Sequence, residues 1–162
     1  MVSINQRLEK DTITLVADEF GFQVQFYNEL DEEDGLIEAP DLPETLVDES
    51  LFRQALLNLV RNAREAMSKG GELVINLRTA TDGGINMTIE DSGSGVPEEL
   101  RASIFDPFFT TKSEGTGLGL SISLKILENH GATIDVVSDE GKGSAFSLHF
   151  PVGLSKSLNV GR

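Results

Sequence analysis

The chain has no cysteine among its 162 residues, which excludes disulfide bonds, thiolate zinc sites and cysteine nucleophiles. Long apolar runs are also missing: no stretch of about 18 apolar residues could span a bilayer, and the first residues lack the apolar core of a signal peptide. These absences predict a cytoplasmic domain that makes no membrane contact. The length is typical of one domain, so we expect a single domain over residues 1–162.

Basic residues are scarce, with 13 lysines and arginines against 27 acidic residues and a formal net charge of -14. A nucleic-acid surface needs an excess of cations that displaces counterions, so nucleic acid is excluded as a partner. A small anionic ligand is not excluded, because a few local cations, backbone N–H groups and a metal ion can hold a phosphate.

The spacing of apolar residues predicts the order of helices and strands. Helical spacing predicts helices over residues 8–20, 49–68, 97–104 and 118–130. Alternation predicts a strand over 22–26 and two hairpins, 73–77 with 85–89 and 134–136 with 146–150. Asp48 is the expected N-cap of the second helix. Helices on one face of a mixed, mostly antiparallel sheet predict a two-layer α+β sandwich.

The segment 29–49 is expected to be a solvated connection, because it is rich in acidic residues and contains Pro40 and Pro43. Its acidic run, 31–34, is interpreted as part of this loop and not as a metal site. The histidines His130 and His149 are expected to be structural, since neither lies in a His-Glu or His-Asp pair. The chain therefore should lack its own phosphorylation site.

Two short motifs carry side chains suited to binding a nucleotide. Asn58 and Asn62 lie one turn apart on one face of the predicted helix 49–68. Asp91 directly follows a predicted strand, where its carboxylate could accept a hydrogen bond from an adenine amino group, and Gly93 and Gly95 would let a ligand approach the backbone. Taken alone, the first motif also fits a solvated helix face and the second a simple turn.

A third motif, G-T-G-L-G at 115–119, opens the predicted helix 118–130. The free N–H groups and the positive dipole end of that helix would make a seat for phosphate. Alone this motif is weak, because it lacks both the strand that precedes a Rossmann fingerprint and the Gly-Lys-Ser/Thr of a P-loop.

The order of the motifs is more specific than any one of them. They are N-x-x-x-N at 58–62, D-x-G-x-G at 91–95, F-D-P-F-F at 105–109, G-T-G-L-G-L at 115–120 and G-K-G-S at 141–144. In this combination the sequence resembles the Bergerat-fold ATPase domain of sensor histidine kinases over about residues 46–151, and 107–123 is similar to the nitrogen-regulation type. The resemblance implies transfer of the γ-phosphoryl group of Mg-ATP to a histidine on a separate dimerisation and phosphoacceptor domain. A response regulator would act downstream, and a membrane anchor elsewhere in the full-length kinase is left open.

The resemblance also implies roles for individual residues. Asn62 would ligate Mg²⁺, Asn58 would lie beside the triphosphate, and Asp91 would bind adenine. Lys112 would contact the γ-phosphate from a mobile ATP lid over 96–116, and with the two asparagines it forms the expected catalytic set. The other expected nucleotide-binding residues are Gly93, Gly95, Thr111, Gly115, Thr116, Gly117, Leu118 and Gly119. The region of Phe105, Phe108 and Phe109 would contact the dimerisation domain.

The sequence departs from many such kinases at Glu65, where they carry a basic residue, so a phosphate contact from this position is not expected. Two other functions stay open. A hydrolysing ATPase of the same fold, of the gyrase, Hsp90 or MutL type, would need a glutamate where Asn58 stands, because an amide cannot act as a general base. A non-catalytic scaffold would not need the asparagines, Asp91 and the glycines that are all present here.

Overall fold

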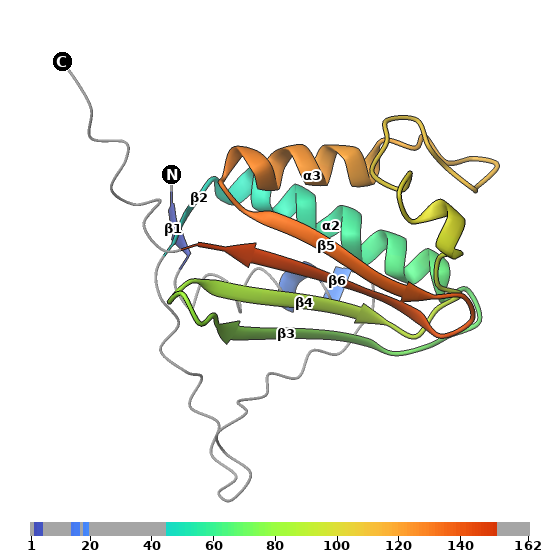
Figure 1. The fold of residues 1–162 in the computed structure, drawn as a ribbon, viewed down its shortest axis with the longest axis horizontal. Coiled ribbons are helices and arrows are strands. Elements are labelled where there is room, and N and C mark those ends of the chain that lie inside the picture. Colours follow the sequence, from blue (N-terminus) through green and yellow to red (C-terminus); the bar gives the residue numbers. More distant parts are fainter. Residues whose placement is uncertain (1, 5–13, 17, 20–44, 152–162) are drawn as a thin grey trace, which may run out of the picture.

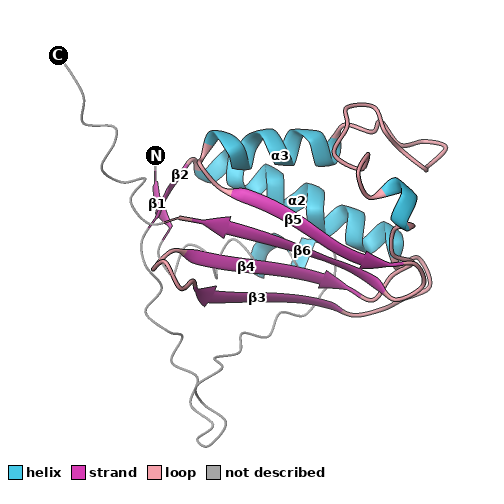
Figure 2. Cartoon of the chain, in the orientation of Figure 1, coloured by secondary structure: helices cyan, strands magenta, loops and turns pink. Residues whose placement is uncertain are grey.

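The structure is a computed structural model that describes residues 2–4, 14–16, 18–19 and 45–151. A four-stranded sheet forms one layer, and two long helices cover one of its faces (Figures 1 and 2). This arrangement confirms the predicted two-layer α+β sandwich. No helix in the described part of the chain combines the length and the hydropathy needed to cross a bilayer.

The sheet is built from two hairpins that meet along β4 and β6. Its strands are β3 (Leu73–Thr79), β4 (Ile85–Asp91), β5 (Thr133–Asp139) and β6 (Gly143–Phe150), in the order β3-β4-β6-β5. Every pairing within it is antiparallel, and the register sets Ile89 opposite both Ile75 and Phe146. Alternation therefore sends one row of apolar side chains toward the helices, as both predicted hairpins require.

The helix α2 (Glu49–Ala66) begins where the sequence predicts, because Asp48 caps it by accepting a hydrogen bond from Leu51 N at 3.0 Å. It ends two residues earlier than expected. Its buried stripe, which packs on the sheet side of the core, consists of Phe52, Ala55, Leu56, Leu59, Val60 and Ala63. The helix α3 (Gly119–Asn129) packs beside it. The predicted helix 97–104 is only the single turn η1 (Glu98–Leu100).

A second, two-stranded sheet was not predicted. β1 (Val2–Ile4) pairs antiparallel with β2 (Thr45–Val47), which lies inside the stretch 29–49 that the sequence assigns to a solvated connection. Three-residue strands are too short to show alternation, so the prediction was wrong there. Residues 14–16 and 18–19 are helical, within the predicted helix 8–20, while the predicted strand 22–26 and the acidic run 31–34 lie outside the described residues.

His130 joins the end of α3 to the start of α2. Its Nδ1 lies 2.6 Å from Ile126 O and its Nε2 lies 3.0 Å from Asp48 N, so the ring donates to the carbonyl and accepts from the amide. His149 lies on β6, with its Nδ1 at 2.7 Å from Asn86 Oδ1 and its Nε2 at 2.9 Å from Asp82 Oδ2. Both histidines thus make structural contacts, as expected from the sequence.

We expect His130→Ala to lower the free energy of unfolding by about 1–3 kcal/mol, because the half-buried amide of Asp48 loses its acceptor. The matched change His149→Ala should cost less, since its partners are reached by water. Urea unfolding followed by circular dichroism measures both. Equal losses in the two variants would show that the contact of His130 does not stabilise the junction of the helices.

Candidate nucleotide-binding site

The polar stripe of α2 faces away from the sheet and carries Asn58, Asn62 and Glu65 at successive turns. Both asparagines are half-buried and Glu65 is exposed. The side-chain amide of Asn58 donates to Gly119 O at 3.2 Å, which ties α2 to the first residue of α3. The Asn58 carboxamide therefore lies at the start of α3, and Asn62 follows it one turn further along α2.

Asp91 ends β4 and is buried, with 8% of its surface exposed. Its Oδ1 accepts a hydrogen bond from Gly93 N at 2.9 Å, and the chain turns there toward α2. Burial raises the pKa of this carboxyl group, and the bond from Gly93 N opposes the shift only in part. A desolvated carboxylate at a strand end is suited to accept one further hydrogen bond from a ligand.

Gly95 meets the turn between β5 and β6. Its φ is +68°, and a Cβ placed on it would lie 2.0 Å from Asp139 O, so only glycine allows this approach. The backbone bond from Gly141 N to Ser94 O, at 2.7 Å, closes the same contact. The structure thus gives Gly95 a packing contact that its predicted place beside the base did not include.

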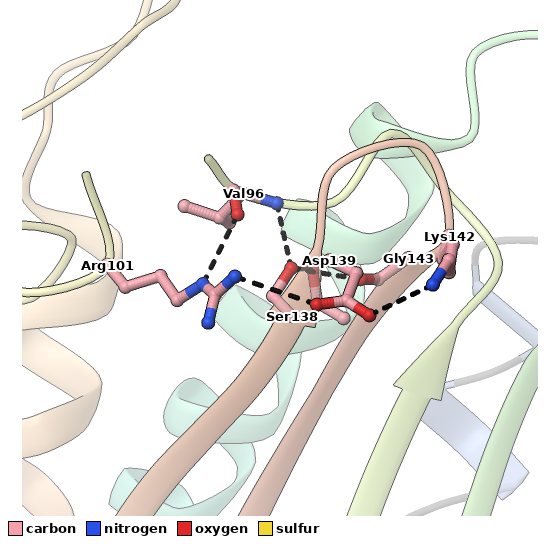
Figure 3. A network of polar contacts seen from close by, with 7 residues as sticks. Val96, Arg101, Ser138, Asp139, Lys142 and Gly143 are labelled. Atoms are coloured by element: carbon pink, nitrogen blue, oxygen red, sulfur yellow. Dashed lines mark hydrogen bonds and ion pairs between the residues drawn. The ribbon is translucent and has the colours of Figure 1, made fainter. Parts of the chain in front are cut away.

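A polar network fixes the start of the lid to the sheet (Figure 3). Ser138 Oγ accepts from Val96 N at 2.7 Å and donates to Gly143 O at 2.9 Å. Asp139 forms ion pairs with Arg101, at 3.6 Å, and with Lys142, at 3.3 Å. The sequence did not predict Arg101, Ser138 or Asp139 as site residues. The one available signal was a serine at an inward position of an alternating strand.

A backbone hydrogen bond closes the second half of the lid into a loop: Phe108 N donates to Gly117 O at 2.8 Å. Gly117 has a φ of +68°, and a Cβ placed on it would lie 2.3 Å from the carbonyl carbon of Phe108. Between them, Lys112 N donates to Thr110 Oγ1 at 3.1 Å and forms a tight turn. The ammonium of Lys112 pairs with the carboxylate of Glu65 on α2.

The three phenylalanines of the F-D-P-F-F motif do not share one environment. Phe105 packs edge-on against Phe146, with ring centroids 6.4 Å apart, and Phe109 also packs against the core. Phe108 is 75% exposed and has a φ of +68°, the one non-glycine residue with positive φ in the described part of the chain. Of the three rings in the region predicted to contact the dimerisation domain, Phe108 is the one that is freely exposed.

The first turn of α3 has no side-chain cap. Thr116 Oγ1 accepts from Leu118 N at 3.4 Å, just before the helix begins, and Gly119 starts it. The uncapped N–H groups of a helix start are donors suited to phosphate oxygens. The exposed Thr111 and Gly115 lie on the loop that leads to this turn.

Segments that are far apart in the sequence converge on the second half of α2. Gly119 meets Asn58, Lys112 meets Glu65, and Ser94 N donates to Ala66 O at 3.2 Å. Nothing among the described residues brings together three histidine, cysteine or acidic side chains as a metal cluster. A metal ion here would therefore take most of its ligands from phosphate and water.

The family described as histidine kinase-, DNA gyrase B- and HSP90-like ATPase matches residues 47–154. The chain is 45% identical to the sensor histidine kinase ZraS of Escherichia coli K12 over 116 residues, which cover 71% of this chain and 24% of ZraS. It thus spans about a quarter of the length of that curated relative.

Solved structures give the same result. The nucleotide-free catalytic domain of the histidine kinase ThkA has a TM-score of 0.72 and 32% identity, with 96% of this chain and 97% of that one covered. ThkA in complex with the response regulator protein TrrA has a TM-score of 0.68 and 28% identity, with 96% of this chain and 42% of that one covered. The chain therefore belongs to the histidine kinase-, DNA gyrase B- and HSP90-like ATPases, and within them to the catalytic domains of histidine kinases.

Proposed function

We propose that this domain binds Mg-ATP and transfers the γ-phosphoryl group to a histidine on a separate dimerisation and phosphoacceptor domain in two-component signalling. The convergence of the asparagine, aspartate and glycine motifs on one half of α2 carries this proposal. Positioning and electrostatic stabilisation suffice for phosphoryl transfer, and the domain offers fixed N–H groups, amides and a lysine for both.

Each part of the nucleotide has a partner in this proposal. Asp91 accepts a hydrogen bond from the adenine amino group, and Gly93 and Gly95 belong to the same base-binding segment. The N–H groups at the start of α3 bind the phosphates, with Asn58 beside them. Lys112 contacts the γ-phosphate. Backbone groups of the glycine-rich loop complete the phosphate site. They belong to Thr111, Gly115, Thr116, Gly117, Leu118 and Gly119.

Asn62 is the proposed magnesium ligand. Its half-buried carboxamide lies one turn from Asn58, which touches the start of α3, and an amide oxygen is a hard ligand that suits Mg²⁺. The ion would supply positive charge next to the phosphates. The absence of an acidic cluster among the described residues fits a site that is completed by the nucleotide.

The partners follow from the same assignment. The dimerisation domain is expected to contact Phe108, whose exposed ring lies at the base of the lid. ThkA forms a complex with a response regulator, and we propose a response regulator as the downstream partner here. We assign residues 1–162 to one domain, with the motifs in 46–151 and a mobile lid over 96–116, and place it in the cytoplasm.

Hydrolysis as the main reaction is disfavoured by Asn58. A water-activating ATPase needs a general base at this helix, and an amide cannot remove a proton. Asn58 is also engaged with Gly119 O, so it is held in place as a hydrogen-bond donor.

Incubation with labelled ATP and Mg²⁺ tests the function directly. We expect label on the histidine of an added dimerisation and phosphoacceptor domain from a similar kinase, and none on this chain. Rapid phosphate release without transfer would identify a hydrolysing ATPase instead. No binding of Mg-ATP at millimolar concentration would identify a scaffold.

Asp91→Asn should weaken ATP binding about ten-fold or more, because one charge-assisted hydrogen bond to the base is lost. Binding of inorganic triphosphate should change little. Equal losses for ATP and GTP would contradict the assignment of the base contact.

The same variant tests the effect of burial on stability. Burial raises the pKa of Asp91, so its ionised form opposes folding at neutral pH, and this penalty disappears as the pH falls below the usual pKa of the group. Asp91→Asn should therefore unfold at the same or higher urea concentration at neutral pH.

Asn62→Ala should abolish the enhancement of ATP binding by Mg²⁺ while leaving the fold intact. The reason is that the proposed amide ligand is removed from a helix face that does not enter the core. Calorimetric titration with and without Mg²⁺ measures the effect, and circular dichroism checks the fold. Asn76→Ala, which removes an exposed amide from β3, is the matched control. An undiminished effect of Mg²⁺ in the Asn62 variant would show that the ligand lies elsewhere.

A further inference from the structure

An ion pair between Lys112 and Glu65 joins the tip of the lid, residues 109–116, to α2. Glu65 lies one turn beyond Asn62 on the polar stripe, so a carboxylate stands beside the proposed phosphate site. Alone, this carboxylate would repel a triphosphate. Paired with the lid lysine, it instead competes with the nucleotide for the same cation.

The two cations of the lid are held differently: Arg101 contacts the sheet, whereas Lys112 contacts α2. The lid, 96–116, is described throughout and contains two basic residues, Arg101 and Lys112. Arg101 is engaged by Asp139 and by Val96 O. Lys112 projects from a turn closed by Thr110 Oγ1 and by Gly115 N, which donates to Lys112 O at 3.3 Å.

We propose that Glu65 is a positioning residue that discriminates ATP from ADP by holding Lys112 on α2 until a third phosphate competes for it. This inference rests on the proposed function, in which Lys112 contacts the γ-phosphate. A γ-phosphoryl group carries more negative charge than one carboxylate, so it attracts the ammonium more strongly. ADP lacks that group and leaves the ion pair in place.

The exposure of the pair fits a contact that is made and broken. The side chains of Lys112 and Glu65 are 45% and 44% exposed. Pairs exposed to this degree change an equilibrium by about two- to five-fold, which holds the lid without blocking ATP. After release, water can solvate the Glu65 carboxylate, so it need not stay buried and unpaired beside the phosphates.

The first test concerns the nucleotide-free chain. We expect Glu65→Gln to make amide hydrogen exchange in 109–116 about two- to five-fold faster, because the tip of the lid loses its tie to α2. Glu114→Gln, which removes a carboxylate from the lid itself, is the matched control and should change exchange less. Reversal of both charges, Glu65→Lys with Lys112→Glu, should restore the slower exchange. Unchanged exchange in Glu65→Gln would overturn the proposal.

The second test is a double-mutant cycle on nucleotide affinity. Glu65→Gln should raise the affinity for Mg-ATP about two- to five-fold and leave that for Mg-ADP unchanged. The gain should vanish in a Lys112→Met background, whereas simple repulsion between Glu65 and phosphate would persist there. Hydrogen exchange of 105–117 should slow with a non-hydrolysable ATP analogue and much less with ADP.

Failure of the proposed function and failure of this inference give different experimental results. Absence of Mg-ATP binding by the unmodified chain at millimolar concentration would overturn the proposed function, and this inference with it. Normal Mg-ATP binding with the same ATP-to-ADP ratio in the parent and in Glu65→Gln would overturn the inference alone. A gain in ATP affinity that is equal with and without Lys112 would also overturn it.

Discussion

The packing of α2 on the sheet is the interaction on which the placement of every motif depends. Val60 and its apolar neighbours are buried against β4 and β6, and each large side chain of this kind stabilises the fold by about 1.5–3 kcal/mol. A helix fixed along one side must present its other side in a fixed direction. The carboxamides, Glu65 and the carbonyl of Ala66 therefore form a rigid edge. The first residue of α3 and two parts of the segment between β4 and α3 contact this edge.

The lid is held differently at its two ends and its tip. Ser138 and Asp139 tie its start to the turn of β5 and β6, and Gly117 closes its far end against Phe108. The contact at the start uses the buried hydroxyl of Ser138, which is costly to separate from its partners. The tip depends on one exposed ion pair, so we expect motion to be concentrated in the few residues around Lys112.

Much of this arrangement could be predicted because it depends on local patterns. Alternation gave both hairpins, Asp48 gave the start of α2, and the order of five motifs gave the family. The Glu65–Lys112 pair could not be found in this way, since 47 residues separate the two and no pattern links exposed charges over that distance. Neither could the different environments of Phe105 and Phe108, because burial there is decided by the backbone of the lid.

The left-handed backbone of Phe108 has a consequence for how this position can vary. An L-residue in that conformation costs roughly 1–2 kcal/mol, and glycine or asparagine would relieve most of it. Either replacement would remove the exposed ring. Under the proposed contact of Phe108 with the dimerisation domain, the substitutions that relieve the backbone are therefore those that remove the contact surface.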